Sequence, residues 1–234
     1  ADFYLRKGKY HESMGDFATA LEYYLQTLNS SEDNSENLSR TYYNIGNLYY
    51  KWDDLDKSQE YFEKILVVAD TSSVSYVRAL INIGTVYLAR KDLDKAAEKF
   101  EDALERLQKL NLESQVVIVY NNLASIYLQR AQFDKAIEIL EQAAEVNKKI
   151  DRIGSLIKNY ANICIIYKTT NNQKELAKYI KKIESLIDQI TDPSLLISIN
   201  EIRRFYYASV GDFQNAYQIL ARTSELKDST FTQE

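Results

Sequence analysis

The 234-residue sequence contains only one proline, six glycines, one cysteine and one histidine. So few prolines and glycines argue against a β-sandwich and against a glycine-rich nucleotide-binding fold. A single cysteine cannot form an internal disulfide, so the fold does not depend on oxidation. With one histidine and one cysteine, histidine-dependent catalytic triads and zinc sites lack the side chains that they require.

Recognisable catalytic and targeting signals are also missing. The sequence has no P-loop and no GxGxxG, HExxH, GxSxG or CxxC motif. It has no run of eighteen apolar residues that could span a membrane, and no signal peptide within residues 1–30. The net charge of −5 argues against a nucleic-acid partner, which requires a concentrated basic face. We therefore expect a non-enzymatic protein with no cofactor, no metal site, and no nucleic-acid or membrane partner.

An internal repeat of 38 to 40 residues is the most informative feature that is present. It is anchored on short turns such as Gly15-Asp16-Phe17 and Asp54-Leu55-Asp56. A small residue follows each turn, and an aromatic ring or the histidine precedes that residue by nine positions. The small residues are Ala20, Ser58, Ala96, Ala136 and Ala216, and the rings are His11, Tyr49, Tyr87, Tyr127 and Tyr207. A weaker repeat contains Tyr167 and Leu176. Much of the high tyrosine count, 19, comes from these repeat positions.

Each repeat is expected to form two helices. In the first helix, Ile45, Gly46 and Tyr49 share one face, and the same pattern recurs in the following repeats. Small residues in both helices let the pair approach closely. Because one pair cannot bury its own apolar face, neighbouring pairs must stack. We predict an all-α, right-handed superhelical solenoid of six helix pairs, forming one domain over residues 1–234, with repeats that begin near residues 1, 39, 77, 117, 157 and 197.

This pattern resembles the tetratricopeptide repeat (TPR) family over essentially the whole chain, and five of the six repeats match well. The long period is similar to that of kinesin light chains, the Pins/LGN adaptors and bacterial Rap-type peptide receptors. The resemblance implies that the first helix of each pair lines a concave groove. The carboxylate clamp of chaperone-binding TPR proteins matches poorly, because Tyr43, Ile81 and Asn121 stand where those proteins carry basic residues.

Local signals outside the repeat are few. His11 occupies the register of the repeated rings, which favours a packing role over metal binding or catalysis. Cys164 occupies a small-residue position and is expected to be buried and unreactive. Few helix caps are recognisable, although Asp192 and Pro193 suit an N-cap followed by the first residue of a helix. Residues 30–37 are predicted to be an exposed connector, and residues 227–234 a frayed tail.

An asparagine precedes the large apolar residue of the first helix in four consecutive repeats. These residues are Asn44, Asn82, Asn122 and Asn162. Asparagine is a mediocre helix former, so helix propensity does not explain the choice. A carboxamide offers a donor and an acceptor that match a peptide group, and the resemblance implies that these side chains hold an extended peptide along the groove. The alternative is that they only bridge neighbouring helices. The first and last repeats depart from the pattern, with Arg6 and Ile202 in this position.

Basic residues accompany the asparagines on the predicted groove face. Arg40, Arg78 and Lys158 lie one turn earlier, and Lys51 and Lys168 lie about two turns later, with no acidic residue among these positions. In a chain of negative net charge, this asymmetry favours an acidic segment or a terminal carboxylate as the ligand. The alternative is a solvated face that is basic by chance. The remaining predicted wall residues are Tyr43, Asn47, Tyr50, Asn121 and Ser125. In the last repeat, Arg203 and Arg204 replace the large and small residues, so this pair is expected to pack differently.

The sequence therefore predicts a cytoplasmic scaffold that binds a protein or an extended, acidic peptide. Two alternatives stay open. The chain could be the ligand-sensing module of a larger signalling protein, such as a histidine kinase, a cyclase or a transcription regulator, in which binding changes the pitch of the solenoid. It could also be a scaffold that self-associates through its end repeats. Because the sequence starts at Ala1, inside a repeat, we expect it to be a piece of a longer protein, and a targeting segment further upstream stays open.

Overall fold

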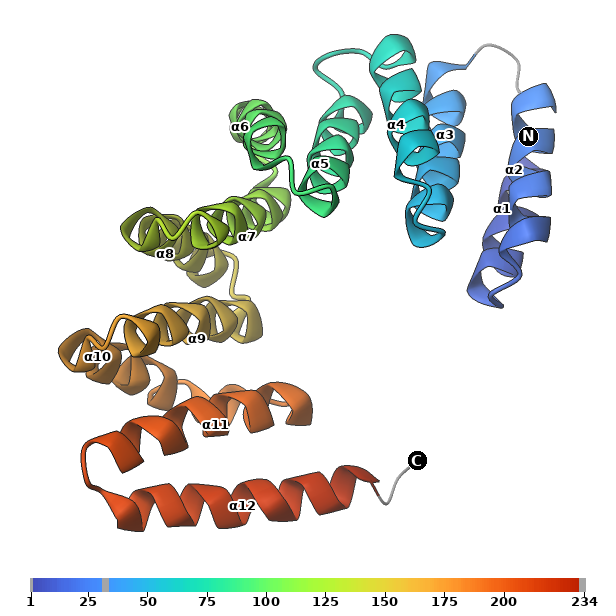
Figure 1. Cartoon of the computed structure of the whole chain (residues 1–234). Coiled ribbons are helices and arrows are strands. Elements are labelled where there is room, and N and C mark those ends of the chain that lie inside the picture. Colours follow the sequence, from blue (N-terminus) through green and yellow to red (C-terminus); the bar gives the residue numbers. More distant parts are fainter. Residues whose placement is uncertain (1, 31–33, 232–234) are drawn as a thin grey trace. The chain divides into compact units, whose positions relative to one another are not determined.

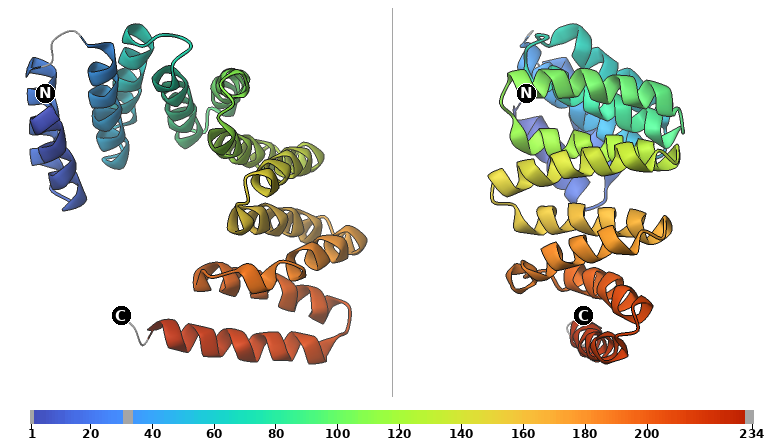
Figure 2. Two further views of the ribbon diagram at one scale, coloured as in Figure 1. Left: turned by 180° about the vertical axis from the view of Figure 1, so that it is seen from behind. Right: turned by 90° about the vertical axis from the view of Figure 1, so that its left-hand side faces the viewer.

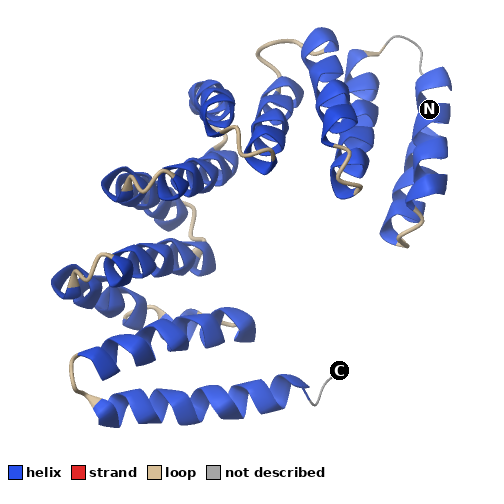
Figure 3. Ribbon diagram, viewed as in Figure 1, coloured by secondary structure: helices blue, strands red, loops and turns tan. Residues whose placement is uncertain are grey.

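The computed structural model describes residues 2–30 and 34–231 (Figure 1), and the side chains up to residue 228. These residues form twelve α-helices and one 3₁₀ helix, Ile187–Gln189, with no strand in this part of the chain (Figure 3). The helices form six consecutive pairs: α1 (Asp2–Ser13) and α2 (Phe17–Ser30), α3 (Ser35–Lys51) and α4 (Leu55–Val68), α5 (Val74–Ala89) and α6 (Leu93–Lys109), α7 (Glu113–Gln129) and α8 (Phe133–Lys149), α9 (Ile153–Thr169) and α10 (Gln173–Glu184), and α11 (Pro193–Ser209) and α12 (Phe213–Phe231). The prediction of an all-α solenoid of six helix pairs is confirmed.

The turn inside each pair has the same construction six times. Each turn begins with a residue in the left-handed backbone region, with φ between 54° and 80°. These residues are Gly15, Asp53, Lys91, Ala131, Asn171 and Gly211. The next residue is an aspartate or asparagine in five of the turns, and its side-chain oxygen accepts a hydrogen bond of 3.1–3.3 Å from the backbone N–H three residues later. These N-caps satisfy donors that the first turn of a helix leaves open. The expectation of few caps was wrong, because the repeated aspartates are themselves the caps.

Within the first three pairs, an aromatic ring of the second helix packs directly over a glycine of the first. A Cβ atom added at Gly46 would lie only 2.6 Å from the nearest ring carbon of Phe62, and one added at Gly84 only 2.9 Å from Phe100. Both rings are almost completely buried. This arrangement confirms that the small residues allow the two helices of a pair to approach closely.

The helix pairs begin earlier than the sequence suggested. From the second pair onward, the first helices start at Ser35, Val74, Glu113, Ile153 and Pro193, three or four residues before the expected positions. Asn34, Ser73 and Asp192 cap three of these helices, and the predicted Asp192–Pro193 start is confirmed. The predicted connector is shorter than expected, because α3 already includes residues 35–37, while residues 31–33 lie outside the described chain. The predicted tail is helical as far as residue 231, and residues 232–234 lie outside the described part.

Two compact units can be distinguished, residues 1–112 and residues 113–234. Within each unit, the second helix of one pair lies against the first helix of the next, as α4 does against α5 and α8 does against α9 (Figure 2). In the first unit, Phe62, Ile65 and Ile83 belong to one core cluster. The second unit has a larger cluster, drawn from α7 to α11. The single domain stays a prediction. No helix in the described part of the chain is long and apolar enough to cross a bilayer.

The last pair packs differently from the others, as expected from its two arginines. The guanidinium of Arg203 donates two hydrogen bonds, of 3.0 and 3.1 Å, to one carboxylate oxygen of Glu184 on α10. The hydroxyl of Tyr207 donates to the same oxygen at 2.8 Å. Arg204 occupies the small-residue position, and Leu220 is 45% exposed, whereas the corresponding Ile180 is fully buried. An ion pair to α10 thus stands at the position where the preceding repeats carry a large apolar residue, while Leu195 and Ile199 of α11 still join the core cluster.

Candidate functional site

A hollow of about 150 Å³ in the first unit brings four of the predicted site residues together. Arg40, Tyr43 and Asn44 reach it from α3, and Arg78 reaches it from α5, the first helix of the next pair. The complete wall consists of Lys9, Ser39, Arg40, Tyr43, Asn44, Ile65, Ser75 and Arg78. Lys9 was not predicted from the sequence, although its repeat position corresponds to those of the predicted residues Asn47 and Ser125.

The wall of this hollow is basic. It contains three cationic side chains and no carboxylate. Arg40 and Arg78 are exposed, and neither guanidinium has an ion-pair or hydrogen-bond partner among the described residues. Lys9 is near Glu12 on the same helix. Burial alone would raise the pKa of Glu12, but hydrogen bonds from Lys51 and Tyr24 and the nearby charges, including that of Lys9, lower it.

The four repeated asparagines differ in their surroundings. The side-chain nitrogen of Asn44 is buried and has no hydrogen-bond partner. Asn82 donates its amide to the backbone carbonyl of Arg78 at 2.9 Å, one turn earlier in α5, so its side-chain oxygen remains available. Asn122 on α7 is half-buried and Asn162 on α9 is exposed. Because two of the four lie in each unit, their spacing along a common groove stays a prediction.

Two asparagines that were not predicted from the sequence, Asn147 and Asn159, form a hydrogen-bonded series with the predicted wall residue Asn121. In the second unit, the buried Asn147 on α8 donates to the buried Asn159 on α9 at 2.7 Å. Asn159 in turn donates to the side-chain oxygen of Asn121 on α7 at 2.8 Å. This series of hydrogen bonds connects α7, α8 and α9. It engages the side-chain oxygen of Asn121, so the nitrogen is the end of that amide that faces outward. A signal was present, because Asn159 occupies a position that holds Ala79 and Val119 in the two preceding repeats.

The predicted basic residues outside the hollow fall into two groups. Lys51 and Lys168 have local partners. Lys51 donates to Glu12 on α1 at 2.6 Å, and the ammonium of Lys168 lies 4.0 Å from the ring centre of Phe205. Lys158 is exposed on α9. Of the remaining wall residues, Asn47 is half-buried and Tyr50 exposed on α3, and Ser125 is half-buried on α7.

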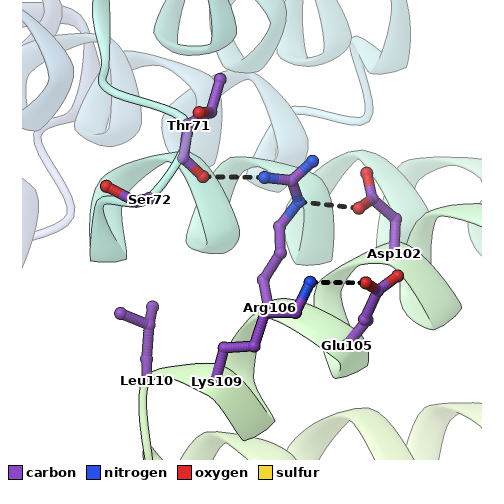
Figure 4. A pocket seen from close by; sticks show the side chains of 7 residues that line it. All are labelled: Thr71, Ser72, Asp102, Glu105, Arg106, Lys109 and Leu110. Atoms are coloured by element: carbon purple, nitrogen blue, oxygen red, sulfur yellow. Dashed lines mark hydrogen bonds and ion pairs between the residues drawn. The ribbon is translucent and has the colours of Figure 1, made fainter.

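A further hollow, of about 200 Å³, lies beside the connection between α4 and α5 (Figure 4). Arg106 donates to the backbone carbonyl of Thr71 at 2.8 Å and to Asp102 at 2.7 Å, while Lys109 pairs with Glu105 at 2.6 Å. The charges of this hollow are therefore satisfied by one another, and the hydrogen bond from Arg106 to Thr71 ties the loop to α6.

The single histidine and the single cysteine lie apart from these hollows. A ring nitrogen of His11 lies 3.1 Å from a carboxylate oxygen of Asp16, and the ring stacks on Tyr23. Cys164 is buried as predicted, and burial raises the pKa of its thiol to about 12, so the reactive thiolate is scarce at neutral pH. Among the residues that the structure describes, no three histidine, cysteine, aspartate or glutamate side chains cluster as metal ligands would.

Comparison with known proteins identifies the family. The tetratricopeptide repeat model matches residues 1–70 and 75–149. Solved structures with the same fold include BtubC (BKLC) from P. vanneervenii, at 18% identity and a TM-score of 0.73, covering 94% of this chain and 91% of that one. The apo form of RapI matches at 17% identity and a TM-score of 0.72, covering 98% of both chains. Aspartyl phosphate phosphatase F from Bacillus subtilis matches at 14% identity and a TM-score of 0.74, covering 96% of this chain and 69% of that one.

No curated protein matches the chain. The family match covers more than half of the sequence and agrees with the six observed helix pairs. The chain belongs to the tetratricopeptide repeat family.

Proposed function

We propose that this protein is a scaffold that binds an extended, acidic segment of another polypeptide through the first helices of its repeats. The observation that carries the proposal is the convergence of Arg40, Asn44 and Arg78 on one basic hollow from two successive first helices. A repeat protein presents equivalent positions along one surface, which suits an extended ligand.

Hydrogen-bonding capacity supports the same function. Asn44 has a buried donor without a partner, and Asn82 retains a side-chain oxygen once its amide is bonded to α5. A peptide backbone offers one N–H and one C=O per residue, so carboxamides can bind it whatever its side chains are. In this proposal, Asn122 and Asn162 continue the same contacts in the second unit.

The test begins with selection of binding peptides from a random peptide library displayed on phage, using the whole chain. Affinities of the selected peptides are then measured by calorimetry for the wild type and for the double variant Asn82→Ala/Asn122→Ala. Each lost hydrogen bond costs on the order of 1 kcal/mol, so we expect the double variant to bind at least about tenfold more weakly. Asn29→Ala is the matched control, because Asn29 is exposed on α2, a second helix.

The salt dependence of binding distinguishes contacts made by the arginine charges from hydrogen bonds made by the asparagines. Arg78→Ala should weaken binding at low salt, and its effect should shrink as salt rises, because exposed charges are screened. The asparagine effects should change little, since they depend on short-range geometry. Undiminished affinity in the double asparagine variant, with unchanged circular dichroism, would refute a role for the asparagines. Selected peptides that lack acidic residues would refute the acidic character of the ligand.

A further inference from the structure

The hollow in the first unit combines cations with neutral hydrogen-bond donors. Lys9, Arg40 and Arg78 supply the charge, and the hydroxyl groups of Ser39, Ser75 and Tyr43 and the amide of Asn44 are the neutral polar groups in the same wall. The Ser39 hydroxyl already donates its hydrogen to the backbone carbonyl of Ser35 at 2.7 Å, so the remaining neutral donors are Ser75, Tyr43 and Asn44. Lysine and arginine side chains can only donate hydrogen bonds. The wall is therefore built mainly of donors, and its natural occupant is a group rich in acceptor oxygens.

The unpaired arginines stand out against the rest of the unit. Arg90 donates to Asp56 at 2.5 Å, Arg106 to Asp102 at 2.7 Å, and Arg6 to Asp2 at 2.9 Å. By contrast, Arg40 and Arg78 have no carboxylate partner among the described residues, although the chain carries 34 acidic against 29 basic side chains. Like charges gathered without counter-charges raise the local concentration of anions.

The balance of charge distinguishes between candidate anions. One carboxylate would leave two of the three positive charges uncompensated. A phosphate monoester carries a charge of about −1.5 to −2 and three strong acceptor oxygens. The planar guanidinium of arginine matches a phosphate with two parallel hydrogen bonds. The hollow is also far larger than the roughly 10–15 Å³ that one water molecule requires.

We propose that this hollow binds a phosphate group carried on a phosphorylated side chain of the bound peptide. This inference rests on the proposed peptide-binding function and names the group that the first unit recognises. Arg40 and Arg78 bind the phosphate oxygens from α3 and α5, Lys9 adds a third charge from α1, and the hydroxyl of Ser75 completes the shell. The terminal torsion of an asparagine is soft, so rotation of the Asn44 amide can turn its unpartnered nitrogen toward the phosphate.

The first experiment uses inorganic ions with the whole chain. We would titrate phosphate, sulfate and acetate at pH 7.5 and constant ionic strength, and follow the arginine and asparagine side-chain NMR signals of ¹⁵N-labelled protein. Phosphate and sulfate should shift the side-chain signals of Arg40, Arg78 and Asn44 with saturation, and acetate should bind at least about tenfold more weakly. Failure of both tetrahedral anions to saturate these signals would overturn the proposal.

Variants test whether the ions bind in this hollow. Arg40→Gln and Arg78→Gln should each weaken phosphate binding by about tenfold, the cost of one charge-assisted contact. Both side chains are exposed, so the fold should be retained, and circular dichroism checks it. Lys109→Gln is the matched control, because it removes an exposed positive charge from the same unit outside the hollow. Equal loss of binding in all three variants would indicate general attraction to the unit's charge and would refute the assigned site.

Short peptides identify the source of the phosphate. We would compare three acetylated, amidated pentapeptides, Gly-Gly-X-Gly-Gly, in which X is phosphoserine, glutamate or serine. The phosphoserine peptide should compete with inorganic phosphate and bind at least about tenfold more tightly than the glutamate peptide. Equal affinity for both would overturn the phosphate assignment and leave the proposed acidic ligand standing. Binding of the free ion without the phosphoserine peptide would overturn the assignment to a modified side chain.

Discussion

Substitution of Gly46 by alanine tests the packing on which every helix pair of the first unit depends. A Cβ atom at Gly46 would lie 2.6, 2.9 and 2.9 Å from three ring carbons of Phe62. Carbon atoms in proteins pack best at about 3.5–4.0 Å, so the ring would have to withdraw by about 1 Å. Phe62 is only 1% exposed, and the core cluster around it, which includes Ile65 and Ile83, leaves it little room to move.

The expected magnitude is a difference between two opposing effects. Overpacking a well-packed core typically costs about 1–3 kcal/mol. Alanine in place of glycine in the middle of a helix gains about 1 kcal/mol of helix propensity. Because the added Cβ would lie 2.6 Å from a ring that is almost completely buried, the overpacking cost should lie in the upper part of this range, about 2–3 kcal/mol. We therefore expect Gly46→Ala to lower the free energy of unfolding by about 1–2 kcal/mol. The matched comparison is Gly154→Ala on α9, where the added Cβ would meet its nearest atom, in Leu195, at 3.9 Å. That variant should be stabilised by up to about 0.5 kcal/mol, since Gly154 lies in the first turn.

The single tryptophan provides a local measurement of this effect. Trp52 lies in the turn between α3 and α4, and its ring centre is 5.6 Å from that of Tyr49, so its fluorescence reports the second pair during urea unfolding. Circular dichroism follows the whole chain in the same samples, because repeat proteins can lose cooperativity. Phe62→Leu should cost less in the Gly46→Ala background than in the wild type. An unchanged or raised urea midpoint for Gly46→Ala would refute the close contact.

Three further predictions concern the turns, acid stability and the last pair. Ala131 has a left-handed backbone with φ of 54°, so Ala131→Gly should raise the free energy of unfolding in urea by about 0.5–1 kcal/mol. Gly211 has φ of 80°, so Gly211→Ala should lower the same free energy by a similar amount. A hydrogen bond from the backbone N–H of Lys95 lowers the pKa of Asp92. The cap's contribution to stability is therefore complete above the unfolded pKa of about 3.9 and is lost as pH falls through the lower folded pKa. Asp92→Asn still caps the helix, so its urea midpoint should fall less than that of the wild type between pH 6 and pH 3. Arg203→Leu should destabilise the second unit by about 1–3 kcal/mol in thermal unfolding, because among the described residues Glu184 would keep only the hydroxyl of Tyr207 as a partner. A neutral result would mean that this ion pair contributes nothing to stability.

The helix pairs could be predicted from sequence because the repeated small residues and the rings that pack on them make contacts inside one pair. Gly46 recurs as Gly84 since each faces a ring on the following helix, and such short-range contacts keep a constant spacing. The first helices were placed too late because their caps, such as Asn34 and Ser73, do not share one register. The capping aspartates were not recognised as caps, although they recur directly before the second helix in the sequence.

The candidate site was predictable to the extent that it follows the same register. Arg40 and Arg78 occupy equivalent positions in successive repeats, and both line the hollow. The partner of Lys51 was not predictable, because its contact with Glu12 depends on how closely two repeats approach. The interaction of Lys168 with Phe205 arises in the same way, between two repeats of the second unit. Contacts between repeats depend on the angle at which pairs stack, which no single repeat encodes.

The unpaired arginines of the first unit, Arg40 and Arg78, should lower the stability of the ligand-free protein. Like charges that face one hollow repel each other, and this repulsion opposes folding unless an anion occupies the site. Natural sequences commonly retain such destabilising features where function requires them. Arg40→Gln and Arg78→Gln should therefore raise the urea midpoint slightly in low salt without phosphate, while they weaken phosphate binding. Added phosphate should stabilise the wild type more than either variant, because a ligand stabilises only the state that binds it. If both substitutions instead destabilised the ligand-free protein, the two arginines would serve the packing of α3 and α5, and the hollow would be a by-product of that packing.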